Sequence, residues 1–294
     1  MNFIELLLLA AIWGASFLFM RVATPAFGPF ALIALRVGIA ALVLLPVVRT
    51  AAARRLVRDH AGTLCLVGLT NSAVPFCLFA YSTLYINAGL DSILNAMTPL
   101  WTALIAASFF QMALSRQQGA GLVLGIAGVA TLAWDALSSH AVGAAPAMGA
   151  ALLATVCYGF AANYSKRRLT GVPPAVVAFG SLFFSTLVLL PFALLSWPTQ
   201  PIIVSTWLCV AGLAILCTGF AYVLYFRLIA RGGAAYAASV TFLIPIFGVL
   251  WGALFLGERI TSREIGGGLI ILLGIAVAGG KLGFLRPGFL RGRP

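Results

Sequence analysis

Charged residues are scarce in this sequence, and acidic ones are the scarcest. Of 294 residues, 8% are charged and only six are Asp or Glu, while 62% are hydrophobic. A soluble domain carries about 25% charged residues. This chain cannot cover its apolar surface in water, so a soluble fold is excluded. The mean hydropathy of +1.09 indicates a membrane protein.

Residues that carry enzyme chemistry are also few. The two histidines, His60 and His140, lie in predicted loops, and the sequence has no HExxH, G-x-S-x-G or P-loop motif. The five cysteines lie inside apolar segments without CxxC spacing, which is typical of small buried hydrophobic residues. We therefore expect no enzyme, no ATP-driven pump, no cofactor and no metal site.

Long apolar runs fill the chain. A transmembrane helix needs about 20 mostly apolar residues, and ten runs approach this length. Because they are continuous and do not alternate, they predict helices and exclude a β-barrel. The predicted fold class is an all-α membrane protein with ten spans. They lie at roughly 3–23, 29–48, 61–85, 89–112, 117–134, 146–165, 174–195, 203–226, 234–256 and 264–281.

Basic residues have a one-sided distribution among the loops. With ten spans, the basic loops after spans two, four, six and eight and the basic tail fall on the same side. Cytoplasmic loops carry the excess of Lys and Arg, so this side and both termini are predicted to be cytoplasmic. The net charge of +12 then reflects orientation, and we expect no nucleic-acid partner. The residues on this side are Arg49, Arg54, Arg55, Arg58, Arg116, Lys166, Arg167, Arg168, Arg227, Arg231, Lys281, Arg286, Arg291 and Arg293; Arg21, Arg259 and Arg263 fall on the other.

Two stretches 146 residues apart resemble each other, with Pro99 aligned on Pro245. In the same ungapped register, capping boxes stand where the next helices should begin. We predict an internal repeat, with one copy at 1–135, a second at 146–281 and a basic cytoplasmic tail at 282–294. Other aligned pairs include Leu104 with Leu250, Ala107 with Ala253, Phe109 with Phe255, Gly121 with Gly267, Gly128 with Gly274, Ala130 with Ala276, and Ser115-x-x-Gln118 with Thr261-x-x-Glu264.

A repeat of five spans has an odd number of crossings, so the second copy must run through the membrane upside down. Inverted-topology repeats are typical of transporters, whose substrate sites lie near the bilayer midplane between the halves. The alternative from another class is a duplicated membrane protein with no transport role, such as an assembly or lipid-handling factor.

Pro99 and Pro245 fall in the middle of spans four and nine. Proline removes a backbone donor and clashes with the carbonyl four residues back. We expect these two spans to bend beside a central pocket and to gate it, with a simple packing kink as the alternative.

Polar and aromatic residues inside the spans are candidates to line that pocket. As a set they suit a ligand with an amine, a carboxylate and an apolar or aromatic body. For any single one, a hydrogen bond between helices is the alternative. The candidates are Trp13, Ser16, Asn71, Tyr81, Asn95, Thr98, Trp101, Tyr158, Asn163, Tyr222, Thr241 and Phe242.

The charged residues near the membrane allow two further expectations. The acidic residues lie near span ends or in loops, whereas a proton-driven antiporter usually needs an acid inside the membrane. We therefore predict that no carboxylate drives transport, and that Glu258 is a structural anchor that pairs with Arg259 or Arg263 or caps a helix end.

Arg36, inside span two, could attract a substrate carboxylate, snorkel outward or hold carbonyls.

The sequence resembles the drug/metabolite transporter superfamily over nearly its whole length, in particular the EamA-type ten-helix members. The resemblance is carried by "IWGASFLFMRVA" (Ile12–Ala23), "ALRVGIAALVLLP" (Ala34–Pro46) and "LIPIFGVLWGALFLGERI" (Leu243–Ile260). It implies two inverted five-helix halves in the bacterial inner membrane and export of amino acids, nucleosides, drugs or other small metabolites. It also implies a cavity lined by helices one, three, four, six, eight and nine.

One departure from related transporters narrows the expected function. Small multidrug-resistance relatives carry a glutamate in their first helix, but Trp13–Phe17 contains no acid. This absence argues against proton-coupled drug antiport. The subfamily that the sequence most resembles exports amino acids, aromatic ones included, so the resemblance implies an exporter of small metabolites, foremost amino acids, that works by alternating access. A multidrug or nucleoside exporter is the alternative. The expected partners are the substrate and membrane lipids, and the chain is expected to be a monomer, with a glycine-mediated dimer as the alternative.

Overall fold

Helices form every regular element of the described chain. The computed structural model describes residues 3–138 and 142–280, and no strand occurs in these two ranges. The all-α fold predicted from the apolar runs is confirmed for them. The tail predicted at 282–294 lies outside the described residues, as does His140.

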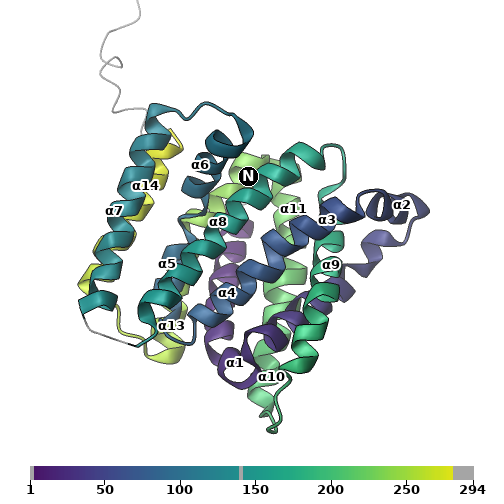
Figure 1. Cartoon of the computed structure of the whole chain (residues 1–294), viewed down its shortest axis with the longest axis horizontal. Coiled ribbons are helices and arrows are strands. Elements are labelled where there is room, and N and C mark those ends of the chain that lie inside the picture. Colours follow the sequence, from purple (N-terminus) through teal and green to yellow (C-terminus); the bar gives the residue numbers. More distant parts are fainter. Residues whose placement is uncertain (1–2, 139–141, 281–294) are drawn as a thin grey trace, which may run out of the picture.

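The helices follow one another with short connections. The first half contains α1 (Phe3–Leu44), a 3₁₀ turn η1 (Leu45–Val48), α2 (Ala51–Asp59), α3 (Ala61–Gly68), a π-helical turn η2 (Leu69–Ala73), α4 (Val74–Ser82), α5 (Ala88–Asn95), α6 (Thr98–Phe110) and α7 (Arg116–Ser138). The second half contains α8 (Ala144–Arg168), α9 (Pro174–Leu195), α10 (Val204–Ala211), a π-helical segment η3 (Gly212–Phe220), α11 (Ala221–Gly232), α12 (Ala234–Ala238), a 3₁₀ turn η4 (Ser239–Phe242), α13 (Ile244–Leu256) and α14 (Ser262–Ala278). Figure 1 shows α7 and α14 side by side at one edge of the bundle.

Six helical stretches of the described chain are long and apolar enough to cross a membrane, or seven if the bent pair Tyr236–Phe242 and Ile244–Leu256 forms one span. One of them, Phe3–Val48, has 46 residues, more than twice the roughly 20 that one crossing needs. The six do not include α7 or α14. Length and hydropathy therefore support six or seven spans in the described residues, and the ten-span arrangement stays a prediction.

Predicted spans one and two are joined without a loop. Their helix is interrupted only at Gly28, whose φ of 70° and ψ of 164° lie in a region that glycine alone adopts readily. Pro29 follows directly and suits the start of a new helical turn, because its missing N–H has no helical partner there. The backbone therefore changes direction at a single residue.

The outer surface of the bundle is apolar. Leu195 is 89% exposed, Leu254 64% and Leu269 61%. Large exposed apolar areas are rare on soluble monomers but are suited to lipid. The exposed residues therefore agree with a multi-pass membrane protein.

Pro99 and Pro245 stand at helix breaks. The prediction that each removes a hydrogen-bond donor from the middle of a helix and clashes with the carbonyl four residues back is wrong. Each lies in the first turn of its helix, α6 or α13, where no N–H is needed. The axis bends by 40° between η4 and α13. The two prolines therefore begin new helical segments and do not remove a hydrogen bond from a helix interior.

The two capping boxes predicted 146 residues apart are confirmed. The backbone N–H of Gln118 donates to Ser115 Oγ at 3.1 Å, and Ser115 N–H donates to Gln118 Oε1 at 2.9 Å. The same reciprocal pair joins Thr261 and Glu264, at 3.1 and 2.7 Å. Both boxes satisfy backbone donors at the first turn of the helix that follows.

Glycines let α7 and α14 pack at backbone distance. A Cβ added at Gly274 would lie 2.6 Å from the carbonyl oxygen of Gly121, and one added at Gly128 would lie 2.8 Å from that of Gly267. These glycines thus serve packing between helices of the same chain. The two contacts are related by the 146-residue offset: Gly128 is the counterpart of Gly274, and Gly267 is the counterpart of Gly121.

A second pair of close contacts, each made by a glycine, joins the two halves in a similar way. A Cβ on Gly14 would lie 2.7 Å from Phe247 Cβ and 2.9 Å from the backbone nitrogen of Gly248. A Cβ on Gly159 would lie 2.9 Å from the backbone nitrogen of Thr102. Thr102 is the counterpart of Gly248 at the 146 offset, whereas Gly159 follows Gly14 by 145 residues, so the contact of α8 with α6 resembles that of α1 with α13 but is shifted by one residue on α8.

Candidate functional site

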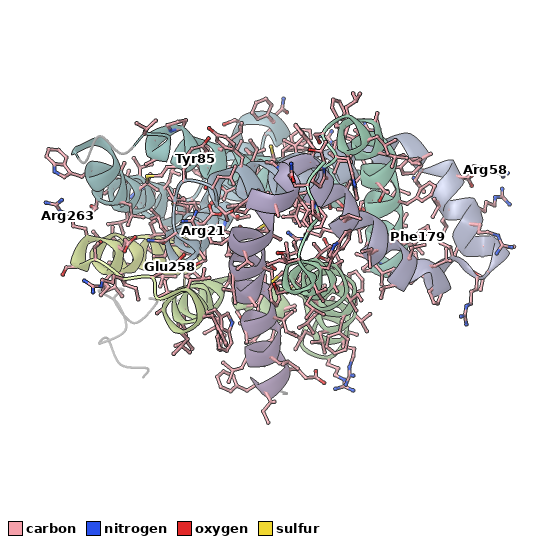
Figure 2. All side chains as sticks on the ribbon, turned by 90° about the horizontal axis from the view of Figure 1, so that it is seen from below. Arg21, Arg58, Tyr85, Phe179, Glu258 and Arg263 are labelled. Carbon is pink, nitrogen blue, oxygen red and sulfur yellow. The ribbon has the colours of Figure 1, made fainter. Side chains whose placement is uncertain are left out.

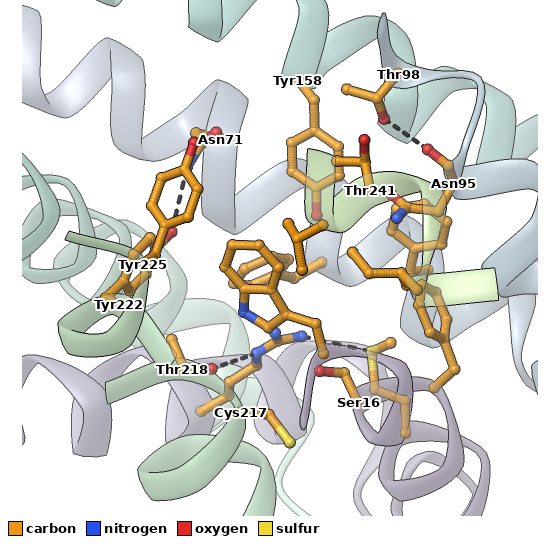
Figure 3. A pocket seen from close by; sticks show the side chains of 18 of the residues that line it. Ser16, Asn71, Asn95, Thr98, Tyr158, Cys217, Thr218, Tyr222, Tyr225 and Thr241 are labelled. Carbon is orange, nitrogen blue, oxygen red and sulfur yellow. Dashed lines mark hydrogen bonds between the residues drawn. The ribbon is translucent and has the colours of Figure 1, made fainter. Parts of the chain in front are cut away.

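A cavity of about 340 Å³ lies among the helices of both halves. It is lined mostly by aromatic and aliphatic side chains, with a few polar groups (Figure 3). The lining residues are Trp13, Ser16, Phe17, Met20, Arg36, Asn71, Phe76, Phe79, Asn95, Thr98, Tyr158, Ala162, Cys217, Thr218, Tyr222, Tyr225, Ala238, Val240, Thr241 and Ile244.

Eight of the twelve residues predicted to line a pocket lie on this cavity. They are Trp13, Ser16, Asn71, Asn95, Thr98, Tyr158, Tyr222 and Thr241. They come from the predicted spans one, three, four, six, eight and nine. The structure therefore brings these residues together, although they are far apart in the sequence.

The other four predicted residues do not line the cavity. Asn163 Nδ2 donates to the carbonyl oxygens of Thr102 and Gly159, each at 2.9 Å, so it joins two helices. The ring of Tyr81 packs against Tyr85, with ring centroids 5.2 Å apart. Trp101 and Phe242 pack against the apolar core. Asn163 thus forms the hydrogen bond between helices that was the alternative to lining the pocket.

Arg36 is the main cavity residue absent from the predicted set. It is 5% exposed, so it does not snorkel outward. Its Nε donates to Thr218 Oγ1 at 2.9 Å, its Nη1 contacts Met20 Sδ at 3.6 Å, and its guanidinium carbon lies 3.6 Å from the centre of the Phe76 ring. In the described parts of the chain, no Asp or Glu forms an ion pair with it.

Thr218 orients this arginine from the π-helical segment η3. Its hydroxyl donates to the carbonyl oxygen of Leu213 at 2.9 Å, so a lone pair is left to accept from Arg36. Single π-helical turns inside α-helices occur frequently at functional sites. A threonine in an apolar helix gave no signal in the sequence, because residue type alone does not show which side of a helix faces a cavity.

The opposite wall of the cavity is built at the break between α5 and α6. Thr98 Oγ1 donates to the carbonyl oxygen of Asn95 at 2.8 Å, and Thr241 Oγ1 donates to that of Ala238 at 2.8 Å. The Asn95 carboxamide has no hydrogen bond to the described residues. Figure 3 shows Asn95, Thr98 and Thr241 across the cavity from Thr218 and Cys217.

A second hollow, of about 520 Å³, adjoins the cavity. The two share Asn71, Ala162, Tyr222 and Tyr225. Asn71 Nδ2 donates to the Tyr222 hydroxyl at 3.4 Å, so a hydrogen bond joins two of the residues that line both hollows. The second hollow extends to Lys166, at the predicted cytoplasmic end of α8.

Hydrogen bonds between the two halves link the ends of α5, α13 and α14. Glu258 Oε1 accepts from the backbone N–H of Ala88 at 2.9 Å, and its Oε2 accepts from Gly89 at 3.3 Å. Asn87 Nδ2 donates to Glu264 Oε1 at 2.7 Å. The expectation that Glu258 caps a helix end is confirmed, and the helix that it caps is α5.

Polar side chains extend this cluster inward. Arg21 Nη1 donates to the carbonyl oxygen of Thr83, and Ser82 Oγ donates to Asp91 Oδ1 at 2.8 Å. Figure 2 shows Arg21, Tyr85 and Glu258 in the same part of the molecule, with Arg58 at the far end of its long axis. Asp91 lies in the first turn of α5, near a span end as expected, but it is fully buried and its Oδ2 has no partner among the described residues.

Comparison with known proteins identifies the family. The EamA-like transporter family matches residues 3–134 and, a second time, residues 145–280. The chain belongs to the EamA-like transporter family. It is a multi-pass membrane transporter of small metabolites and not an enzyme.

Relatives of this EamA-like transporter carry names that agree. A probable amino-acid metabolite efflux pump of Salmonella typhimurium is 28% identical, with 92% of each chain covered. A probable terminal-alkyne amino-acid exporter of Streptantibioticus cattleyicolor is 25% identical, with 92% of this chain and 90% of the relative covered. One solved crystal structure shares the fold, with a TM-score of 0.63 and 20% identity over 94% of this chain and 98% of the other.

Proposed function

We propose that this EamA-like transporter exports amino acids, aromatic and apolar ones included, across the bacterial inner membrane by alternating access. The observation that carries the proposal is the cavity between the halves, which joins an aromatic and aliphatic lining to a guanidinium and to amide and hydroxyl groups. Ligand sites are largely apolar with a few placed polar groups, and about 340 Å³ is at the small end of their range. An amino acid offers a matching apolar body and two polar groups.

Alternating access requires two states related by exchanging the roles of the halves. Two inverted repeats, at 1–135 and 146–281 with ten spans in total, provide two such states, because each half can take the conformation of the other. The support comes from the family match to each half and from the glycine contacts that interchange at the 146 offset, such as Gly274 on Gly121 and Gly128 on Gly267. The breaks at Pro99 and Pro245 lie beside the cavity and would let α6 and α13 move as separate segments.

The structure corresponds to an inward-facing state in this proposal. The cavity adjoins the hollow beside Lys166, which the positive-inside rule assigns to the cytoplasm. Glu5, near the N-terminus, pairs with Arg227 at 2.8 Å and Arg231 at 3.1 Å. This supports the predicted position of the N-terminus on the side of the loop between spans eight and nine. The cluster around Glu258 then closes the outer face.

Uptake by proteoliposomes tests the proposal. Purified protein is reconstituted and offered a panel of labelled amino acids and, separately, cationic dyes. We expect saturable flux of at least one amino acid that empty liposomes lack. Flux of dyes or nucleosides without amino acids would favour the drug or nucleoside alternative, and no flux of any solute would favour a non-transporting role.

A further inference from the structure

Arg36 is a buried cation that faces the cavity without a counter-ion. We propose that Arg36 binds the carboxylate of the transported molecule, so that the cavity selects substrates with a free carboxylate and excludes cations. This inference rests on the proposed function, which it deepens by naming the group that the site recognises.

Burial is the first reason. A charge in the membrane interior is costly and is normally paired with another charge or placed in a water-filled cavity. Arg36 is 5% exposed, and its protein contacts are a hydroxyl, a thioether and an aromatic ring, all without negative charge. Its positive charge is therefore available to a negative group that enters the cavity.

The geometry of the guanidinium is the second reason. Phe76 covers one face at 3.6 Å, and Thr218 holds Nε at 2.9 Å. The described residues give Nη2 no hydrogen bond, and Nη1 has only the weak contact with Met20 Sδ at 3.6 Å. The edge with the two terminal nitrogens is therefore the part left to bind a ligand. A fixed planar guanidinium of this kind suits bidentate binding of a carboxylate.

The charge balance of the cavity is the third reason. No Asp or Glu is among its lining residues in the described chain. A cationic ligand would meet a buried positive charge and no acid to offset it, which is an effective way to reject a wrong ligand. The ammonium group of an amino acid is still accommodated, because the Asn95 carboxamide and the hydroxyl oxygens of Thr98 and Thr241 can accept from it on the other wall.

Pairs of ligands that differ only at the carboxyl group test this inference. The first pair is L-phenylalanine and L-phenylalaninamide; the second, without an amine, is phenylacetate and phenylacetamide. Binding to the purified protein is measured by thermal stabilisation for the native chain, Arg36→Gln, Arg36→Lys and Thr218→Val. Arg58→Gln is the matched control, because Arg58 is an exposed arginine of α2 outside the cavity.

We expect the native protein and Arg58→Gln to bind each carboxylate at least tenfold more tightly than its amide. Arg36→Gln should lose this preference, since a charge-assisted hydrogen bond contributes about a tenfold factor or more. Arg36→Lys should keep part of it. Thr218→Val should weaken carboxylate binding severalfold, and it decides the question if Arg36→Gln does not fold.

The outcomes separate this inference from the proposed function. Arg36-dependent binding of phenylacetate without flux of any amino acid would support carboxylate recognition and reject amino-acid export. Amino-acid flux with equal binding of acid and amide would support export and overturn the role of Arg36. The role is also overturned if a folded Arg36→Gln variant keeps the carboxylate preference, or if the native protein binds no member of either pair and no amino acid of the panel.

Discussion

Glu258 Oε1 accepts a hydrogen bond from the backbone N–H of Ala88 at 2.9 Å, which ties the end of α13 to the start of α5. A carboxylate at a helix N-terminus is stabilised both by the free N–H groups and by the helix dipole. The bond joins the two halves at the end of the bundle that the proposed orientation assigns to the outer face. It must break if the cavity is to open there.

Glu258→Ala should open the outer side of the cavity more often. Without the carboxylate, the N–H groups of Ala88 and Gly89 lose their partners in the closed arrangement. We expect Ala162→Cys, in a background with the native cysteines replaced by alanine, to react faster with an impermeant thiol reagent added from outside. Ala162 is a suitable reporter because it lines both the cavity and the adjoining hollow.

Ser196→Cys is the control for this labelling. Ser196 is exposed at the end of α9, on the predicted outer face, so its reaction should not depend on Glu258. Equal labelling of Ala162→Cys with and without Glu258→Ala would show that Glu258 does not hold the outer side closed.

Asn95 and Asn163 should respond differently to replacement by alanine. Asn95 lines the cavity with an uncommitted carboxamide, so its loss should raise the dissociation constant of the substrate by about two- to tenfold. Asn163 donates to Thr102 and Gly159, so its loss should lower the unfolding temperature and leave affinity nearly unchanged. Binding titrations and thermal unfolding in detergent measure both. Reversed effects would mean that the cavity residues are wrongly assigned.

Gly121→Ala should destabilise the protein by about 1–3 kcal/mol, because overpacking displaces well-packed neighbours. The added methyl group would meet Ala278 Cβ at 2.7 Å, as well as the backbone of Gly274. Gly119→Ala is the matched control on the same helix, since a Cβ added there would have no neighbour within 4 Å. Alanine also favours helix over glycine by up to about 1 kcal/mol. Equal unfolding temperatures for the two variants would contradict close packing of α7 on α14.

Asp91→Asn should leave transport independent of a proton gradient and close to the native rate. Asp91 is the fully buried acid of the described chain and thus the first candidate for a proton carrier, but its Oδ1 accepts from Ser82 and it does not line the cavity. We assign it a structural role. Substrate-linked proton flux in proteoliposomes that is abolished by this single change would contradict that role and the prediction that no carboxylate drives transport.

Much of this structure follows from sequence patterns. Continuous apolar runs predicted the helices, because backbone polar groups in lipid must be satisfied within the segment. The 146-residue offset predicted both capping boxes, and the polar residues within the spans predicted eight cavity residues. These signals depend on residue type and on local spacing, which the sequence contains directly.

The remaining features depend on how the helices are rotated against each other. Asn163 and Asn95 look alike in the sequence, yet one joins two helices and the other faces the cavity. Thr218 lies in the π-helical segment η3 and accepts from Arg36 Nε, a contact that depends on how η3 is rotated against α1. The burial of Asp91 likewise results from packing around α5, which a single residue in an apolar run does not reveal.

Counterflow tests the central claim most directly. Proteoliposomes loaded with unlabelled L-phenylalanine are diluted into a trace of labelled L-phenylalanine, and the internal label is followed over time. A carrier that alternates between two faces should accumulate label transiently above the outside concentration, and Arg36→Gln should not. Label that only equilibrates would indicate a passive pore, and label that stays outside would contradict transport of this amino acid by the cavity.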